Sequence, residues 1–300
     1  MASTHRLAMV RSVAAHAVGA RGTRTSVLGR HRKDIAIAGL VLTIVLSLAI
    51  GLSGCAATPA LPEESPQNRT VRVLAYNIRH GEGMDRELDL ERVAAVIRAV
   101  RPDIVTLQEV DWKVDRTGRV DQAAHLGDLT EMEHAFGPFM EYQGGEYGMA
   151  VLSRWPIIVS VNHELPPGEE PRSTLAARIR LPGDAGEVVV AGVHFYRTEA
   201  ERLSQAREIV DIFEQEPAPV ILAGDFNSQP GSRVMDLIAL HWTVPDKARP
   251  TQTFPADRPE REIDFIGYRP ADRFEVLEYR VIDERIASDH RPVLMVLRPR

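Results

Sequence analysis

Six short segments carry polar side chains at the ends of apolar runs, and their residue types are those of hydrolytic chemistry. They are Tyr76-Asn77, Gln108-Glu109, Val193-His194, Gly224-Asp225-Phe226-Asn227, Ile263-Asp264-Phe265 and Ser288-Asp289-His290. A carboxylate or an amide buried beside a strand costs several kcal/mol unless it is paired or bound to a metal. So many polar groups at strand ends therefore predict one shared cleft.

The acids and amides of these segments form a set of oxygen donors. Glu109, Asp225 and Asp289, together with Asn77 and Asn227, suit a hard cation such as Mg²⁺, and Mn²⁺ is a second possibility. The sequence contains one cysteine and no His-x₃-His pair, so a zinc site is poorly supported.

The histidines and the Asp-x-Asn pair supply the other half of the chemistry. His194 and His290 can donate hydrogen bonds to the charge that develops on a phosphoryl group. A histidine needs a partner that fixes its tautomer, and Asp264 is the available carboxylate. Asp225 and Asn227 are two residues apart, so on extended backbone they would face the same way.

The elements that position these residues alternate between short strands and amphipathic helices. We predict strands over residues 71–76, 104–108, 150–153, 175–181, 188–193, 220–223, 263–267 and 293–297, and helical faces within residues 90–100 and 203–213. This mixture predicts an α/β fold. Asn77 and Asp225 follow their strands, whereas Asp289 and His290 precede theirs, so the last strand must run antiparallel to the others if all are to meet. We therefore expect mixed sheets.

The order and spacing of these motifs resemble the DNase I-like endonuclease/exonuclease/phosphatase superfamily. The resemblance covers about residues 71–298 and implies a four-layer α/β sandwich, in which two packed mixed β-sheets are flanked by helices. It also implies a metal-dependent phosphoric ester hydrolase. Within the resemblance, Glu109 is similar to the main metal ligand, with Asn77 beside it. Asp225 resembles the residue that activates the attacking water, and Asn227 its phosphate-holding neighbour.

The resemblance also implies roles for the remaining segments. His194 is similar to a contact of the scissile phosphate, Asp264 and His290 resemble a supporting acid–imidazole pair, and Asp289 a further carboxylate on the metal side. Met149 departs from the pattern, since many members have Asn there, and this puts a phosphate contact from that strand in doubt.

Each motif also has an ordinary structural interpretation. Asp225-Phe226-Asn227 could be a turn with side-chain hydrogen bonds, Glu109 a solvated strand end, and Asp289 part of a plain loop. Their ordered occurrence together favours the site. Two polar clusters are expected to have no catalytic role: a solvent-facing loop that includes Asp111 and Arg116, and the polar start of a helix at Arg197, Glu199, Glu201 and Arg202.

The N-terminal segment is typical of export. Seven bases and one acid precede a run without charge that ends in Leu52-Ser53-Gly54-Cys55, and this run resembles a bacterial lipobox. We expect residues 1–54 to be a signal peptide, residues 55–69 a flexible tether on a lipidated Cys55, and residues 70–300 the catalytic domain, outside the cytoplasm at a membrane. An uncleaved signal anchor is the alternative.

Charge narrows the substrate class. The 300-residue chain has a net charge of −6 from 36 bases and 42 acids. Without residues 1–54, 29 bases remain against 41 acids, which gives −12. Neutralisation of phosphates by basic residues supplies most non-specific affinity for nucleic acid, and an acidic protein offers little of it. A lipid head group or a small organic phosphate is therefore slightly favoured as the substrate. Extracytoplasmic cleavage of DNA or RNA is the alternative, and a non-catalytic surface binding protein with the same fold is a second one. We expect a monomer.

Overall fold

The computed structural model describes residues 70–300. The predicted signal peptide, tether and lipidated Cys55 lie outside the described residues. Among the helices of residues 70–300, none combines the length and the apolar character that crossing a bilayer requires.

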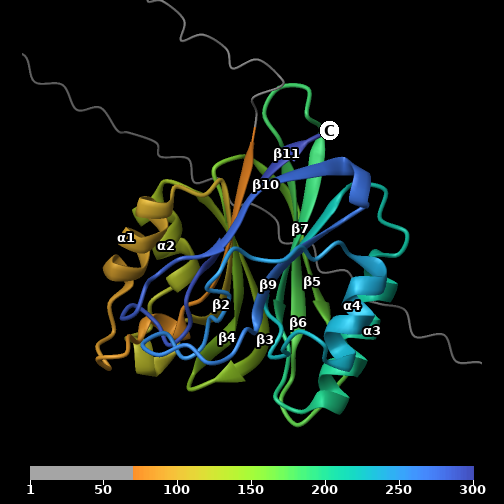
Figure 1. The fold of residues 1–300 in the computed structure, drawn as a ribbon. Helices are drawn as coiled ribbons and strands as arrows, with labels where there is room; N and C mark the ends of the chain where they lie inside the picture. Colours follow the sequence, from red (N-terminus) through yellow and green to blue (C-terminus); the bar gives the residue numbers. More distant parts are fainter. Residues whose placement is uncertain (1–69) are drawn as a thin grey trace, which may run out of the picture. The chain divides into compact units, whose positions relative to one another are not determined.

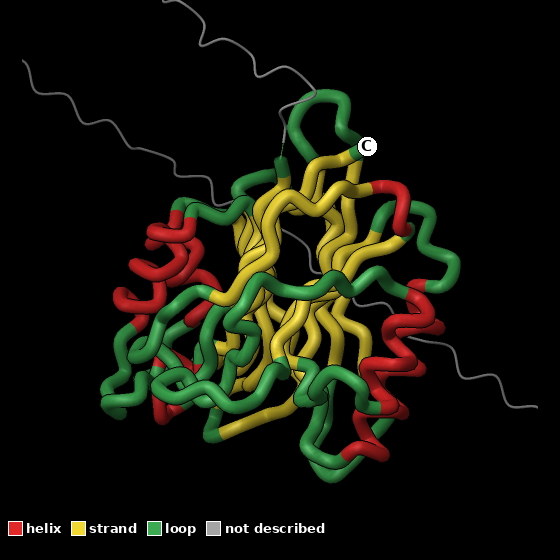
Figure 2. Tube along the Cα trace, viewed as in Figure 1, coloured by secondary structure: helices red, strands yellow, loops and turns green. Residues whose placement is uncertain are grey.

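The strands form two mixed sheets that pack face to face (Figures 1 and 2). The first sheet has the order β10-β11-β1-β2-β4-β3, from β1 (Val71–Asn77), β2 (Ile104–Trp112), β3 (Glu133–Tyr142), β4 (Gly145–Ser153), β10 (Phe274–Val281) and β11 (Val293–Pro299). The second has the order β5-β6-β7-β8-β9, from β5 (Ile157–Glu164), β6 (Ser173–Arg180), β7 (Glu187–His194), β8 (Val220–Asp225) and β9 (Asp264–Arg269).

Within residues 70–300, four α-helices complete the outer layers. Figure 1 shows α1 (Leu90–Val100) and α2 (Gln122–Thr130) on one side of the paired sheets, and α3 (Glu199–Phe213) and α4 (Arg233–His241) on the other. Asp89 and Asp121 cap the first two helices by accepting backbone N–H bonds from Arg92 and Ala124. The molecule is thus a four-layer α/β sandwich, as predicted.

Apolar side chains fill the three interfaces between these layers. A central cluster that includes Val151, Leu175 and Met295 lies between the sheets. A second cluster holds α3 and α4 on their sheet, and a third holds α1 and α2. Because both faces of each sheet are covered, the central strands are buried almost throughout and lack the alternation of half-exposed strands.

Strand direction brings the polar segments to one end of the sandwich. β1 and β2 are parallel, as are β7 and β8, whereas β11 runs antiparallel to β1 and β9 antiparallel to β8. The register pairs His194 with Asp225 and Asp225 with Asp264. The predicted reversal of the last strand is therefore confirmed.

Several elements differ from the sequence prediction. β3, β5 and β10 and the helices α2 and α4 were not predicted. β5 is mostly exposed, including Ile158 and Val159, so it shows neither alternation nor a buried run. β2 was predicted to end at Gln108 but extends to Trp112.

Candidate active site

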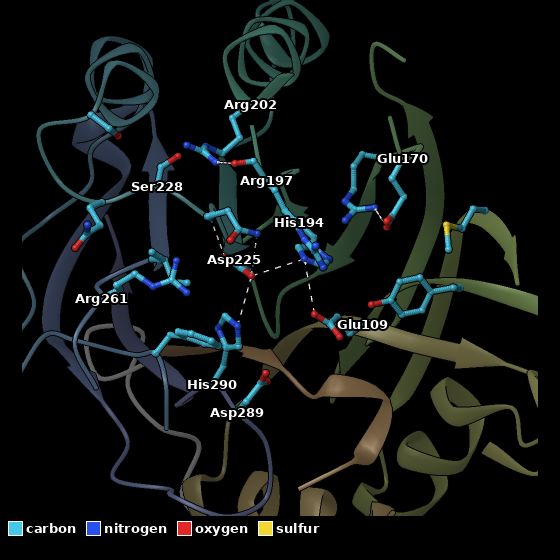
Figure 3. A pocket seen from close by; sticks show the side chains of 18 of the residues that line it. Glu109, Glu170, His194, Arg197, Arg202, Asp225, Ser228, Arg261, Asp289 and His290 are labelled. Carbon is cyan, nitrogen blue, oxygen red and sulfur yellow. Dashed lines mark hydrogen bonds and ion pairs between the residues drawn. The ribbon is translucent and has the colours of Figure 1, made fainter. Parts of the chain in front are cut away.

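An open cleft of about 890 Å³ lies at the end of the sandwich where the polar segments meet (Figure 3). Six of the residues predicted from the sequence line it: Glu109, His194, Asp225, Asn227, Asp289 and His290. The other two, Asn77 and Asp264, are buried behind this lining and contact it. The fold thus brings together all eight.

Glu109 enters the cleft through an irregularity in its strand. The pairing of β2 with β4 shifts between Gln108 and Val110, and Glu109 has φ 60°. A non-glycine residue in this region is uncommon and costs on the order of 1 kcal/mol or more. A bulge of this kind turns one side chain out of the alternation of its strand. Glu109 was predicted to follow its strand, but it lies within it and is aimed into the cleft by the bulge.

Asp225 occupies the centre of the polar cluster. Its Oδ2 lies 3.7 Å from Nε2 of His194 and 3.7 Å from Nε2 of His290. The amide nitrogen of Asn77 bridges the carboxylates, at 3.0 Å from Oε1 of Glu109 and 3.3 Å from Oδ2 of Asp225. Asp225 is 1% exposed, so these contacts are made almost without water.

Asn227 is held against Asp225 by a turn. Its backbone N–H donates to Oδ1 of Asp225 at 2.8 Å, and its amide donates to the carbonyl of Phe195 at 2.9 Å. The extended backbone expected between the two residues is wrong, because Asn227 has φ 48° and follows the end of β8. The two side chains nevertheless lie together.

Gly224 explains how the two sheets approach so closely beneath the cleft. It has φ 148°, and a Cβ atom at this position would lie 2.1 Å from the carbonyl oxygen of Val193 and 2.9 Å from the amide nitrogen of Gln108. Any side chain would push β8 away from its neighbours and displace Asp225.

Asp264 and His290 form the expected acid–imidazole pair. Nδ1 of His290 lies 3.0 Å from Oδ2 of Asp264, and both side chains are buried. The ring of Phe254 covers the imidazole at a centroid distance of 4.8 Å. The free Nε2 of His290 consequently faces Asp225 and the cleft.

The environment separates the charge states of the two histidines. Burial alone would lower the pKa of His290, but Asp264 and Asp225 outweigh it and raise this pKa to about 10. Burial, and then Arg172, lowers the pKa of His194 well below its ordinary value. His290 is therefore a cation at neutral pH and His194 is neutral, and the buried Nδ1 of His194 has no hydrogen-bond partner within residues 70–300.

The carboxylates carry negative charge that their neighbours only partly compensate. Burial raises the pKa of Asp225 to about 7 against the opposing effect of His290. Burial also raises the pKa of Asp289, whose Oδ2 lies 3.7 Å from Nε of Arg79. Crowded oxygen donors of this kind fit a hard divalent cation beside Glu109 and Asp289.

A second group of possible metal ligands, Asp225, Asp264 and His290, has its ligand atoms within 4.8 Å of one another. It is the weaker candidate, because Asp264 and His290 already satisfy each other and a protonated imidazole cannot ligate a metal. The chemistry of the donors therefore favours the side of Glu109.

The sequence analysis missed the wall of the cleft that contains Arg116, Tyr142 and Tyr147. The loop around Asp111 was predicted to face solvent, but Asp111 is fully buried and accepts hydrogen bonds of 2.8 and 2.7 Å from Arg116. Arg116 in turn lies over the rings of Tyr142 and Tyr147, which also line the cleft. Burial and then Glu109 raise the pKa of Tyr147 well above its usual value, so its hydroxyl stays protonated beside Glu109.

Met149 contributes nothing to the cleft. Its side chain is fully buried in the cluster between the sheets, and its sulfur lies close to Gly192. Tyr147, two residues earlier on β4, is the residue of this strand that lines the cleft.

The fold and the acid–histidine cleft define a class of four-layer α/β sandwich proteins, and comparison with known proteins names the family. Residues 74–290 match the Endonuclease/Exonuclease/phosphatase family, and the chain belongs to it. Its members are generally hydrolases.

Several relatives share most of the length of the chain. YbhP of Escherichia coli (strain K12) is 29% identical over 248 residues, which covers 78% of this chain and 98% of YbhP. The crystal structure of an endonuclease/exonuclease/phosphatase from Beutenbergia cavernae superposes with a TM-score of 0.63 at 28% identity, over 77% of this chain and 72% of that one. The mannosyl-6-phosphatase Bt3783 of Bacteroides thetaiotaomicron shares the fold, with a TM-score of 0.61 at 18% identity over 76% and 99% of the two chains.

Proposed function

We propose that this chain is a Mg²⁺-dependent phosphoesterase, with Mn²⁺ as a possible substitute, that hydrolyses a phosphate ester by in-line attack of water. The observation that carries the proposal is the position of Asp225. Its carboxylate faces the Nε2 atoms of two histidines, both at 3.7 Å, and shares the amide of Asn77 with Glu109. This is the arrangement of a base beside donors for a developing negative charge.

Asp225 is the base that takes a proton from the attacking water. Its pKa of about 7 suits this role, because a base works best near the pH of the reaction. The N–H of Asn227 fixes one carboxylate oxygen and leaves the other toward the cleft. The amide of Asn227 is anchored on the carbonyl of Phe195 and borders the place of the phosphate.

His290 supplies positive charge to the phosphoryl oxygens through its Nε2–H. Asp264 keeps the ring oriented and charged. Neutral His194, whose Nε2 lies 3.7 Å from Oδ2 of Asp225, would donate a hydrogen bond to the phosphoryl group from the other side of Asp225. Because both rings are nearly buried, little water competes for these donors.

Glu109 and Asp289 would hold the cation, with Asn77 beside them. When bound, the ion supplies positive charge that stabilises the developing charge on a phosphoryl oxygen. The other side chains orient the substrate and accept the proton of the attacking water.

The substrate we favour is a lipid head group or a small organic phosphate. The charge of −12 outside residues 1–54 supports this choice over nucleic acid, and a lipidated Cys55 would hold the enzyme at a membrane outside the cytoplasm. The name of the Bacteroides phosphatase gives one case of a small phosphomonoester on this fold.

The test is a hydrolysis panel with the purified full chain in Mg²⁺, Mn²⁺ or EDTA. It includes sphingomyelin, phosphoinositides, a sugar phosphate, a chromogenic diester, duplex DNA and RNA. We expect metal-dependent turnover of a lipid or small phosphate that falls about 10²–10⁴-fold in Asp225→Asn. Asp211→Asn, on the exposed face of α3, is the matched control. Absence of metal-dependent turnover across the panel would favour a binding protein, and preferential cleavage of DNA or RNA would favour a nuclease.

A further inference from the structure

One wall of the cleft carries arginines that the acid–histidine centre does not use. Arg197, Arg202 and Arg261 line the cleft, and within residues 70–300 none of them forms an ion pair with a carboxylate. The arginines of the opposite wall differ, since Arg116 is paired with Asp111 and Arg172 with Glu170. Only the first wall therefore presents uncompensated positive charge to a ligand.

Arg202 and Ser228 show that this wall is built into the fold. Nη1 of Arg202 donates to the backbone carbonyls of Tyr196, at 3.4 Å, and of Arg197, and this holds the guanidinium in place. In the described part of the chain, the Nε of Arg202 and the hydroxyl of Ser228 are buried without a hydrogen-bond partner, and Ser228 is 2% exposed. Figure 3 shows the Ser228 hydroxyl pointing toward the guanidinium of Arg202. Buried donors without partners are costly, and an incoming acceptor would satisfy them.

Arg261 connects this wall to the catalytic centre. Its guanidinium lies over the ring of Phe254 at 4.4 Å, and Phe254 contacts the imidazole of His290. Ser232, the N-cap of α4, also lines the cleft, so the positive end of that helix lies at the same wall. Donors from three separate chain segments thus surround one part of the cleft.

We propose that Arg197, Arg202, Ser228 and Arg261 bind a second phosphate group of the substrate, while the scissile phosphate occupies the acid–histidine centre. The inference rests on the proposed function and specifies its substrate as a compact molecule with two phosphates. Planar guanidinium groups match phosphate oxygens in geometry as well as charge. The cleft, at about 890 Å³, has room for a ligand much larger than one phosphate.

A compact bisphosphate fits these observations better than a polymer. Binding along nucleic acid draws on many neutralised phosphates, whereas this wall offers three unpaired arginines on a part of the chain whose net charge is −12. A bisphosphate can be soluble or can be the head group of a lipid, and both present the same chemistry to the wall.

The kinetic test compares bisphosphates with matched monophosphates, using the full chain. The soluble arm uses inositol 1,4-bisphosphate against inositol 1-phosphate and inositol 4-phosphate. The lipid arm uses vesicles of phosphatidylinositol 4-phosphate against phosphatidylinositol. We expect kcat/KM to favour the two-phosphate compound at least tenfold in one arm, and that arm identifies the source. The double variant Arg197→Gln/Arg261→Gln should bring the ratio close to one.

Further variants test whether the loss of preference is specific to the residues of this wall or follows from any loss of positive charge. Arg207→Gln, on the exposed face of α3 outside the cleft, should keep the wild-type ratio. Ser228→Ala should lower the ratio without lowering the melting temperature, because its hydroxyl has no hydrogen-bond partner within residues 70–300. A ratio near one for the wild type in both arms overturns the proposal. So does a single-stranded oligonucleotide that is the best substrate and loses its rate in the double variant.

A binding measurement distinguishes failure of this inference from failure of the proposed function. Inorganic phosphate is titrated calorimetrically in EDTA, where no turnover occurs. We expect the dissociation constant to rise about tenfold or more in Arg197→Gln/Arg261→Gln, given the usual strength of charged hydrogen bonds, and to stay unchanged in Arg207→Gln. This result in a protein that hydrolyses nothing would support the anion site and refute the phosphoesterase. Equal affinity of wild type and double variant would overturn the anion site even if hydrolysis were found.

Discussion

Replacing Asp225 by Asn should stabilise the fold while it removes activity. Burial raises the pKa of this carboxyl from an ordinary value of 3.8 to about 7. At about 1.4 kcal/mol for each pKa unit, the charged form is disfavoured in the folded protein by up to about 4 kcal/mol. Asn keeps the size of the side chain without that charge. His290 loses the carboxylate that faces it, which offsets part of the gain, so we expect a net increase of about 1–2 kcal/mol.

The way in which stability depends on pH determines the direction of the expected difference in melting temperature. Because the folded pKa lies above the unfolded one, the wild-type carboxyl costs nothing while it is protonated in both states, below pH 3.8, and its cost grows until the pH passes about 7. The difference in melting temperature between Asp225→Asn and the wild type should therefore increase from pH 4 to pH 8. About 1–2 kcal/mol corresponds to roughly 2–8 °C in a domain of this size.

The assay is a series of thermal melts in EDTA at pH 4 to 8, followed by circular dichroism, with Asp211→Asn as the control for a surface charge. The same proteins are assayed for hydrolysis over a titration of Mg²⁺, where Asp225→Asn should lose about 10²–10⁴ in kcat without recovery at high metal. A variant that melts below the wild type at pH 8 refutes the reasoning about burial. If high Mg²⁺ restored the rate of Asp225→Asn, the base would have to be another residue.

Three further changes test the remaining roles. Glu109→Gln should raise the Mg²⁺ concentration required for half-maximal activity, with part of kcat recovered at high metal, as a metal titration would show. His290→Ala should lose as much rate as Asp225→Asn, whereas Asp264→Asn should be milder because Asp264 acts only through the ring; steady-state kcat for both variants decides whether the order is right. Cys55→Ser should abolish palmitate labelling and signal cleavage, and a wild type that takes up no label and keeps residues 1–54 would point to a signal anchor instead.

The sequence was most informative where strand ends carry chemistry. The order of polar segments and the reversed position of Asp289 and His290 were enough to predict mixed sheets and a shared cleft. The helices at residues 90–100 and 199–213 could be predicted because each buries one face. The exposed edge strand β5 could not, because its sequence has no hydrophobic periodicity. Fold prediction therefore failed mainly at elements that bury little of their surface.

Other features of the site depend on contacts that no local pattern reveals. Glu109 enters the cleft through a bulge, and Asn227 reaches Asp225 through left-handed backbone. Asp111 is buried because Arg116, five residues later, folds back onto it. The single signal in the sequence was the density of charged residues after β2, which is equally typical of a solvated loop. Register irregularities and long-range ion pairs have to be observed in three dimensions.

Side chains that position others in the site already have hydrogen-bond partners within residues 70–300, whereas some side chains that we expect to contact a ligand do not. Asp264 holds His290, and Asp111 holds Arg116, so each pair is complete without a ligand. Within residues 70–300, the hydroxyl of Ser228 and the Nε of Arg202 are buried donors without hydrogen-bond partners. Each such atom reduces the stability of the free protein, because water cannot reach it. The cost is recovered only when a ligand supplies acceptors, and these atoms border a single cleft. We therefore expect the same buried donors that lower the stability of the unliganded fold to bind the proposed second phosphate.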